Sequence, residues 1–238
     1  MSLPRFHLPA SSWTGPHLTL TCDEAAHCSR VMRKQPGDRI EVFDGAGRVA
    51  ACEITHVSKS EVGARIISET CAQPFKAAIH LLPALIKAEP FEWLLEKAVE
   101  LGAASIQPVI TARTVIHLDA AQTEKKLAKW RRHMIESAKQ CHTPFVTELK
   151  APVAFSDSLS HPAALKLIPA LSEHSRTLKQ VPPATSVAVL IGPEGDFTPG
   201  EEHLARQAGF QPVTLGPLVL RAETAAITTL AILGHELR

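Results

Sequence analysis

The chain has 238 residues, 45% of them hydrophobic, and a formal net charge of +1 at pH 7. This length allows one large domain or two modest ones, each with a substantial buried core. A nearly neutral chain is not a polycation that coats nucleic acid indiscriminately, so any surface for nucleic acid has to be local.

Residues 1–72 predict a small β-rich domain. Its strand-like runs are residues 38–44, 48–57 and 62–69. The Asp44-Gly45 pair between the first two runs is a hairpin signal. One helix is expected from Asp23 to Arg33, with Asp23 as its N-terminal cap. A small β-barrel is the simplest closure of these strands, and residues 72–76 predict a linker.

Residues 73–238 alternate between strand and helix, which is typical of a parallel sheet covered by helices. The strand-like runs are residues 78–86, 105–111, 164–171, 186–192 and 211–216. One helix is expected from about Phe91 and ends at Gly102. A longer helix is expected from about Thr123 to Gln140, and its apolar face is made by Leu127, Trp130, Met134 and Ala138.

The rest of this long helix is basic, with Lys125, Lys126, Lys129, Arg131 and Arg132. Rows of lysine and arginine neutralise phosphates, which favours binding of nucleic acid. A solvated helix face explains the same residues, because Glu124 and Glu136 dilute the run and no aromatic residue interleaves for stacking. Both interpretations stay open.

The cysteines and the first residues bear on where the protein works. Five cysteines at irregular spacing fit reduced thiols better than a disulfide framework. Neither Cys22, His27 and Cys28 nor Cys141 and His142 complete a four-ligand metal spacing. No signal-peptide pattern is present, and no apolar run approaches the ~20 residues that span a bilayer. We therefore expect a cytoplasmic protein without a metal or a membrane segment.

Residues 191–233 carry the strongest functional signal. Two apolar runs end at Gly192 and Gly216, and ligands of open α/β sheets bind at such carboxyl ends. Between them, Thr198 and Glu201 predict a capping box that begins a helix. Glycine permits a positive φ and close approach of a flat ligand. An ordinary strand-to-helix turn explains residues 192–195 alone, but the polar cluster after Gly216 favours a ligand site.

Three segments carry a resemblance to a known family: residues 27–47, residues 85–114, and the IGPEG and LGPLVLRAETAA loops. Together they resemble the RsmE family of ribosomal RNA uridine methyltransferases, which belongs to the SPOUT class. The resemblance implies an α/β fold with a SPOUT-type parallel sheet and a C-terminal deep trefoil knot in residues 73–238, and a PUA-like small β-barrel that binds RNA in residues 1–72. It also implies S-adenosylmethionine as methyl donor, N3 of a specific uridine in small-subunit (16S) ribosomal RNA as acceptor, and a homodimer.

The resemblance also implies site residues. Those expected at the cofactor are Leu167, Ile191, Gly192, Pro193, Glu194, Gly195, Leu215, Gly216, Leu220, Thr224 and Ala225. Glu194 has a second interpretation, in which its carboxylate only satisfies backbone N–H groups. Those expected at RNA are Arg5, His7, Arg30 and Arg33, since arginine offers forked donors to phosphates. A solvated surface is the alternative for that group.

Transfer of a methyl group to N3 requires in-line attack by the nitrogen and loss of its proton. Glu223 is the candidate base, and Arg221 is the candidate to stabilise negative charge on the uracil carbonyls. An ion pair between these two residues, or across a dimer, is the alternative.

The sequence also departs from the family pattern. Leu218 stands where an arginine is common, Asp196 where a glycine is usual, residues 141–143 where Ser-Gly-Arg is typical, and Ile168 where a more polar residue is expected. These changes weaken the electrostatic side of an RNA site, so a catalytically weakened or inactive RNA-binding or ribosome-assembly protein is the alternative function. A Rossmann-type enzyme is disfavoured, because neither G-x-G-x-x-G nor G-x-x-x-x-G-K-[ST] occurs.

Overall fold

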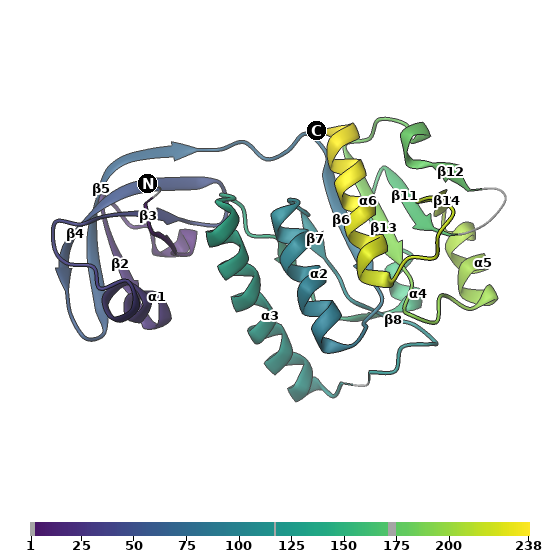
Figure 1. Ribbon diagram of the computed structural model, residues 1–238, viewed down its shortest axis with the longest axis horizontal. Helices are drawn as coiled ribbons and strands as arrows, with labels where there is room; N and C mark the ends of the chain where they lie inside the picture. Colours follow the sequence, from purple (N-terminus) through teal and green to yellow (C-terminus); the bar gives the residue numbers. More distant parts are fainter. Residues whose placement is uncertain (1–2, 117, 171–174) are drawn as a thin grey trace. The chain divides into compact units, whose positions relative to one another are not determined.

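The computed structural model describes residues 3–116, 118–170 and 175–238 (Figure 1). The chain forms two compact units. The first comprises Met1–Pro74 and Ile135–Val146, and the second comprises Phe75–Met134 and Thr147–Arg238. The expected first domain, residues 1–72, did not include the segment Ile135–Val146. No helix among the described residues has both the length and the apolar run needed to cross a membrane.

The first unit is built on a five-stranded sheet with the order β1-β3-β4-β5-β2. Its strands are β1 (Arg5–His7), β2 (His17–Thr21), β3 (Arg39–Phe43), β4 (Arg48–Val57) and β5 (Glu61–Cys71). The β1–β3 pair is parallel and the other pairs are antiparallel. Its core buries Phe6, Leu18, Leu20, Ile40 and Val42. Within the described residues β1 and β2 are the edge strands and do not pair with each other, so the expected small barrel is present in an open form, a curled half-barrel.

Local chemistry explains the turn between β3 and β4. The Asp44 carboxylate Oδ1 accepts the backbone N–H groups of Ala46 (2.7 Å) and Arg48 (3.0 Å), which closes the predicted hairpin. The expected helix at residues 23–33 is shorter and less regular: α1 (Cys22–Ala26) continues into a π-helical turn, His27–Val31. Asp23 lies in the first turn of α1, and the cap position belongs to Thr21. The short strands β1 and β2 were not predicted.

The second unit is built on a seven-stranded sheet in which every strand pair is parallel, as the alternating pattern predicted. The strand order is β12-β14-β11-β13-β6-β7-β9. The strands are β6 (Ala78–Pro83), β7 (Ser105–Ile106), β9 (Glu148–Leu149), β11 (Leu165–Pro169), β12 (Arg176–Thr177), β13 (Ser186–Ile191) and β14 (Gln211–Thr214). After β11 the chain forms the edge strand β12. It then forms β13, which lies between β11 and β6, and finally β14, which lies between β11 and β12. The carboxyl ends of β13, β11 and β14 are therefore neighbours.

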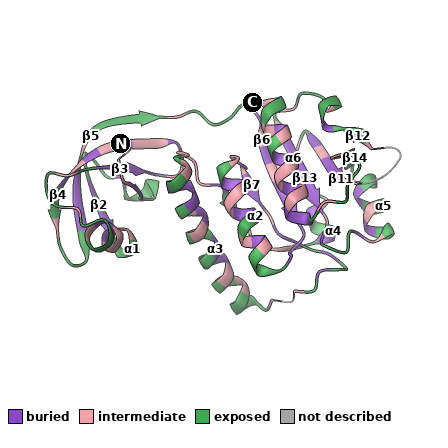
Figure 2. Ribbon diagram, in the orientation of Figure 1, coloured by how far each residue is buried: buried purple, intermediate pink, exposed green. Residues whose placement is uncertain are grey.

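Helices cover both faces of this sheet. They are α2 (Ala88–Glu100), α3 (Ala120–Cys141), α4 (Phe155–Ser158), α5 (Pro199–Gln207), α6 (Ala222–Leu237) and the 3-10 turn η3 (Leu178–Gln180). On one face α6 packs on α2, β6 and β13 (Figure 1). The other face carries a core formed by Leu82, Phe155, Leu190, Phe197 and Phe210. Figure 2 shows the central strands buried between these layers.

One predicted strand is divided in two. Residues 105–111 form β7 and β8 (Val109–Ile110), and β8 pairs with β10 (Val153–Ala154) in a separate two-stranded sheet. Pro108 has no backbone N–H to extend the ladder, which accounts for the break. The buried face of α3 is confirmed: Leu127, Trp130, Met134 and Ala138 are each at most 2% exposed.

Two histidines pack together beside the sheet of the second unit. The His161 side chain is buried, and neither of its ring nitrogens has a hydrogen-bond partner among the described residues. Its ring centroid lies 5.0 Å from that of His80, and Nδ1 of His80 is 2.7 Å from Oγ of Ser105. Burial lowers the pKa of both imidazoles, and the nearby Lys150 ammonium lowers them further.

This pair predicts acid sensitivity. The unfolded chain protonates both imidazoles near their ordinary pKa of about 6.5, whereas the folded chain keeps them neutral to lower pH. Stability is therefore fully present above about pH 6.5 and falls as the pH drops below it. Glu148 opposes the shift at His80, and Lys166 adds to it at His161.

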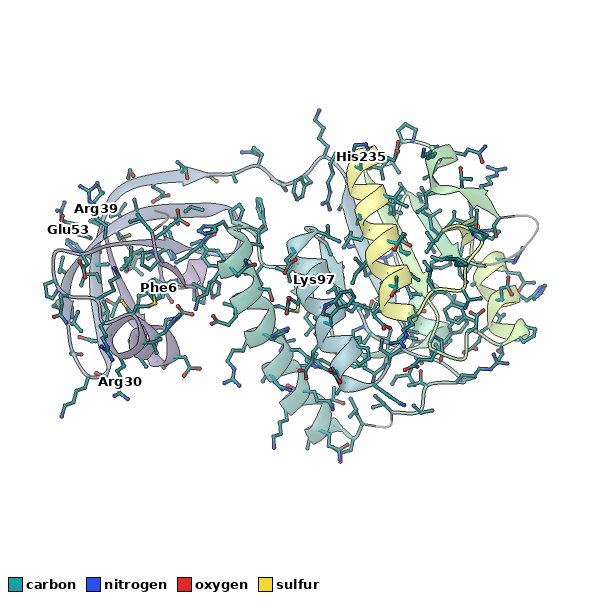
Figure 3. The ribbon with its side chains drawn as sticks, viewed as in Figure 1. Phe6, Arg30, Arg39, Glu53, Lys97 and His235 are labelled. Atoms are coloured by element: carbon teal, nitrogen blue, oxygen red, sulfur yellow. The ribbon has the colours of Figure 1, made fainter. Side chains whose placement is uncertain are left out.

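We expect the thermal midpoint of the wild-type protein to fall between pH 7.5 and 5.5 by more than that of His161→Phe. The exposed His235 (Figure 3) provides the control, and His235→Gln should follow the wild type. Differential scanning calorimetry at the two pH values checks this. The same loss in all three proteins would contradict the assignment to the histidine pair.

Candidate functional site

Three loops meet at the carboxyl ends of β13, β11 and β14. They enclose a cavity of about 290 Å³. Small-molecule sites usually start near 300 Å³, so this cavity is at the small end of their range. The cavity lies at the edge of the sheet where the sequence predicted a ligand site, since open α/β sheets bind ligands where the strand order reverses.

The first loop follows β13 and begins with Gly192. A Cβ added to Gly192 would lie 3.0 Å from Oδ1 of Asp196 and 3.3 Å from the Phe197 ring, so a larger residue would force the loop to move. The backbone turns between Pro193 and Asp196, where the Asp196 N–H donates to the Pro193 carbonyl (2.9 Å). Phe197 then enters the core against Phe155, with ring centroids 5.7 Å apart. The loop is thus anchored at both ends.

Asp196 holds an uncommon backbone conformation in this loop. Its φ is +60°, a region that glycine adopts readily and that asparagine and aspartate adopt more easily than other residues. Its Oδ1 accepts the N–H of Phe197 (2.7 Å), which helps to hold the conformation. The aspartate therefore holds a conformation that favours glycine, the residue expected here from the family pattern, and adds a carboxylate to the cavity wall.

A buried carboxylate and an arginine hold the first loop against a segment far away in sequence. The predicted capping box is present: Thr198 Oγ1 accepts the Glu201 N–H, and the Glu201 carboxylate accepts the Thr198 N–H (2.9 Å). The other oxygen of Glu201 accepts the N–H of Ala112 (2.8 Å). The Arg113 guanidinium donates to the carbonyls of Gly195 and Phe197.

The hydrogen bonds to the Glu201 carboxylate lower its pKa. Burial by itself raises the pKa of this carboxyl, but the donors at Ala112 and Thr198, together with the nearby Arg113, leave the pKa below its usual value. The carboxylate is thus kept charged.

The second loop follows β14 and leads into α6. Thr214 Oγ1 accepts the N–H of Gly216 (3.2 Å), and Gly216 has φ +122°, which strains any other residue. Leu218 and Val219 follow, 72% and 85% exposed. Arg221 is the N-cap residue of α6, where its carbonyl accepts the Ala225 N–H (2.8 Å).

The structure brings most of the predicted site residues together. The predicted residues on the cavity wall are Ile191, Gly192, Pro193, Glu194, Leu215, Gly216, Leu220, Arg221 and Ala225. Four others are not on this wall: Leu167, Gly195, Glu223 and Thr224. Leu167 is fully buried within β11, Gly195 faces Arg113, and Glu223 is buried in the first turn of α6.

Other residues on the cavity wall were not among the predicted site residues: Pro169, Ala170, Asp196, Leu218, Val219 and Ala222. Of these, Asp196 and Leu218 had been noted only as departures from the family pattern. Pro169 ends β11 and Ala170 follows it. Both could have been predicted, because ligands of open α/β sheets bind beyond the carboxyl ends of the strands. Arg113 was missed as well, because nothing local in sequence connects it to Gly195.

The residues expected at RNA occupy two kinds of position in the first unit. Arg30 and Arg33 are exposed, and Arg30 can be seen at the surface in Figure 3. Arg5 does not fit the expectation of a surface contact, because its side chain is only 4% exposed. Its Nε lies 3.1 Å from the Glu41 carboxylate, and its guanidinium lies 4.4 Å from the Phe43 ring centroid.

His7 is half-buried in the same region. Its ring packs against Phe43 with centroids 5.2 Å apart, and burial lowers its pKa although Asp44 acts in the opposite direction. A neutral, partly covered imidazole is a weaker phosphate ligand than an exposed arginine. Among the described residues no cluster of three His, Cys, Asp or Glu side chains is arranged to hold a metal ion.

Two protein-family models match the chain. An RNA methyltransferase domain matches residues 73–234, and an RNA methyltransferase PUA domain matches residues 20–67. The second match identifies the curled half-barrel as PUA-like.

Relatives of known identity match almost the whole chain. Ribosomal RNA small subunit methyltransferase E of Bacillus subtilis is 30% identical over 235 residues, covering 93% of this chain and 91% of the relative. Its counterpart in Synechocystis sp. is 32% identical over 223 residues, covering 90% and 71%.

Solved structures agree with these relatives. A methyltransferase from Legionella pneumophila in complex with its bound cofactor SAM is 34% identical, with a TM-score of 0.92 and coverage of 99% and 98% of the two chains. Ribosomal RNA small subunit methyltransferase E from Neisseria gonorrhoeae, bound to S-adenosyl methionine, is 29% identical with a TM-score of 0.90 and the same coverage. With one model matching most of its length and relatives aligned from end to end, the chain belongs to the ribosomal RNA small subunit methyltransferase E (RsmE) family.

Proposed function

We propose that this protein transfers a methyl group from S-adenosylmethionine to N3 of a specific uridine in small-subunit ribosomal RNA. The observation that carries this proposal is the cavity formed by two glycine loops and the start of α6. Relatives with the same fold bind S-adenosyl methionine. Membership of the family supports ribosomal RNA as the acceptor.

The cavity has features that suit this cofactor. S-adenosylmethionine, when bound, supplies an electrophilic methyl group on a positively charged sulfonium. Gly192 and Gly216 bring backbone close to the cavity, and Ile191, Leu215 and Leu220 offer apolar surface to an adenine ring. The Glu194 and Asp196 carboxylates lie on the same wall and complement a cation.

Arg221 and Asp196 are the residues that we assign to the acceptor. Arg221 lies on the cavity wall at the start of α6, where its guanidinium stabilises negative charge on a uracil carbonyl. N3 must lose its proton as it attacks the methyl group. Glu223 is buried and away from the wall, so we assign the role of proton acceptor to Asp196 in its place.

The first test is nucleoside mass spectrometry of 16S ribosomal RNA from small subunits that lack the modification, after incubation with the protein and S-adenosylmethionine. We expect new N3-methyluridine at one position. RNA binding without any methylated nucleoside, beside an active relative, would favour the alternative of a catalytically weakened or inactive RNA-binding protein, for which the exposed Leu218 in place of an arginine is the motivating observation.

The same assay distinguishes Asp196 from Glu223 as the proton acceptor. Asp196→Asn keeps a residue that tolerates the left-handed backbone, and loss of a general base lowers the rate by about 100-fold or more. Glu223→Gln should leave the turnover of folded protein within a few-fold of wild type. The reverse order of the two rates would restore Glu223 as the base.

Arg113 predicts a second effect, on binding of the cofactor. Hydrogen bonds from a charged group contribute about 1.5–3 kcal/mol, so Arg113→Ala should weaken S-adenosylmethionine binding by about tenfold or more through loosening of the loop at Gly195. Isothermal titration calorimetry measures this affinity. Arg206→Ala is the matched control, because within the described residues its guanidinium makes a surface ion pair with Glu202 (2.6 Å) and no hydrogen bond or ion pair with the glycine loops. Equal affinity of the two variants would remove Arg113 from the site.

We also propose that the working form is a homodimer. Leu218 and Val219 expose large apolar side chains at the rim of the cavity. α6 consists mainly of small and apolar residues, yet Ala231 on it is exposed and Ile227 is only half-buried. A second copy placed on this surface would cover apolar area and help to enclose a cavity that is small for its ligand.

A double substitution, Leu218→Asp with Val219→Asp, should convert the dimer to a monomer and weaken cofactor binding, since charge on an apolar contact opposes association. Sedimentation velocity gives the mass, and calorimetry gives the affinity. Exposed Leu204 on α5 provides the control substitution, Leu204→Asp. A wild-type monomer with full activity would contradict the dimer.

Three further assignments rest on the same resemblance. We infer a trefoil knot in the second unit. Support comes from the strand order, because β13 and β14 are each inserted between strands that precede them in the chain. The exposed Arg30 and Arg33 support contact of the first unit with RNA. A ribosomal substrate and unpaired cysteines support a cytoplasmic location.

A further inference from the structure

Positive charge is concentrated on α3. This helix carries six of the 25 lysines and arginines but only two of the 24 acidic residues. The remainder of the chain therefore has an excess of acidic residues. A nearly neutral protein thus contains one strongly basic element.

The structure separates the roles of these basic residues. Lys139 is buried in the first unit, with Nζ 2.9 Å from Glu24 and 2.8 Å from Glu136, so it serves folding. Lys125, Lys129 and Arg132 are exposed and follow one another at helical spacing. Figure 2 shows exposed and buried residues alternating along α3.

These exposed residues, together with Gln122, Lys126 and Ala128, form one continuous face of α3 that lies wholly within the second unit. At 1.5 Å per residue, the stretch from Gln122 to Arg132 extends over about 15 Å of the helix surface. We name Gln122, Lys125, Lys126, Lys129 and Arg132 the α3 basic face.

We propose that the α3 basic face binds the phosphate backbone of ribosomal RNA, an inference that rests on the proposed function. Interfaces between proteins usually have an apolar or aromatic centre, whereas this face consists of charged and amide side chains with the small Ala128 among them. Phosphates need exposed cations and little else. The composition of the face therefore fits RNA better than a protein partner.

The neighbouring acidic residue does not block this role. Lys129 Nζ lies 2.6 Å from the Glu92 carboxylate, but its side chain is still 59% exposed. A surface ion pair of this kind contributes little to stability, so a phosphate can replace the carboxylate at small cost.

The α3 basic face has no ring with which to stack on bases. Trp130 on the same helix is buried, and its ring packs against Phe91 with centroids 4.8 Å apart. The contact is therefore to the backbone of a folded RNA segment and independent of sequence. The proposed cofactor cavity is lined by a separate set of residues of the second unit.

The test compares two triple variants of the full-length protein that remove the same charge. Lys125→Gln, Lys129→Gln and Arg132→Gln neutralise the α3 basic face. Lys76→Gln, Lys87→Gln and Lys179→Gln neutralise exposed lysines elsewhere on the second unit. Fluorescence anisotropy with a labelled 16S ribosomal RNA transcript gives the affinity at several salt concentrations.

We expect the α3 variant to bind about tenfold or more weakly near physiological salt, and its slope of log affinity against log salt to fall by about two to three, since each phosphate contact contributes about 0.7–0.9. The control variant should retain the wild-type slope. The α3 variant should also show a raised KM for small subunits, an unchanged kcat and an unchanged affinity for S-adenosylmethionine.

Other results would overturn the proposal in distinguishable ways. An unchanged salt slope in the α3 variant excludes a phosphate contact at this face. Unchanged binding to the transcript together with loss of methylation on assembled subunits assigns the face to a ribosomal protein. If the wild type makes no N3-methyluridine but still shows the α3-dependent salt slope, the proposed function fails while the RNA surface stands.

Discussion

The site depends on one buried carboxylate. Glu201 accepts hydrogen bonds from Ala112 and Thr198, which lie far apart in sequence, and so joins the segment after β8 to the beginning of α5. A buried carboxylate is costly unless its oxygens are satisfied, and here both oxygens have backbone donors. Because the first glycine loop ends at Thr198, this interaction fixes where that loop can lie.

The order of the strands then determines what the loop faces. β11 lies between β13 and β14, so the ends of three strands from distant parts of the chain border the same space. Each strand is short, and the parallel ladder leaves its carboxyl end pointing to one edge of the sheet. The cavity is thus a consequence of topology, and both glycine loops contribute to its wall.

Patterns of neighbouring residues in the sequence correctly predicted those structural features that depend on interactions between neighbouring residues. The capping box at Thr198 and Glu201, the hairpin at Asp44 and the buried face of α3 are confirmed. Contacts across the chain were beyond such patterns, because the hydrogen bond between Ala112 and Glu201 spans 89 residues. The division of the predicted strand into β7 and β8 at Pro108 could have been predicted, since proline lacks the N–H that a strand needs to pair on both sides.

The family likeness and the chemistry of single residues contributed different things to the site. The likeness placed both glycine loops at the cavity, but it also suggested Glu223 as a base, and burial of Glu223 away from the wall argues against that role. Asp196 shows the opposite case: it departs from the expected glycine, yet its φ of +60° is a conformation that favours glycine, and it adds a carboxylate. Leu218 likewise exchanges an expected charge for exposed apolar surface at the rim. Both departures change the charge around the cavity, whereas the glycines at 192 and 216 that shape the two loops are present.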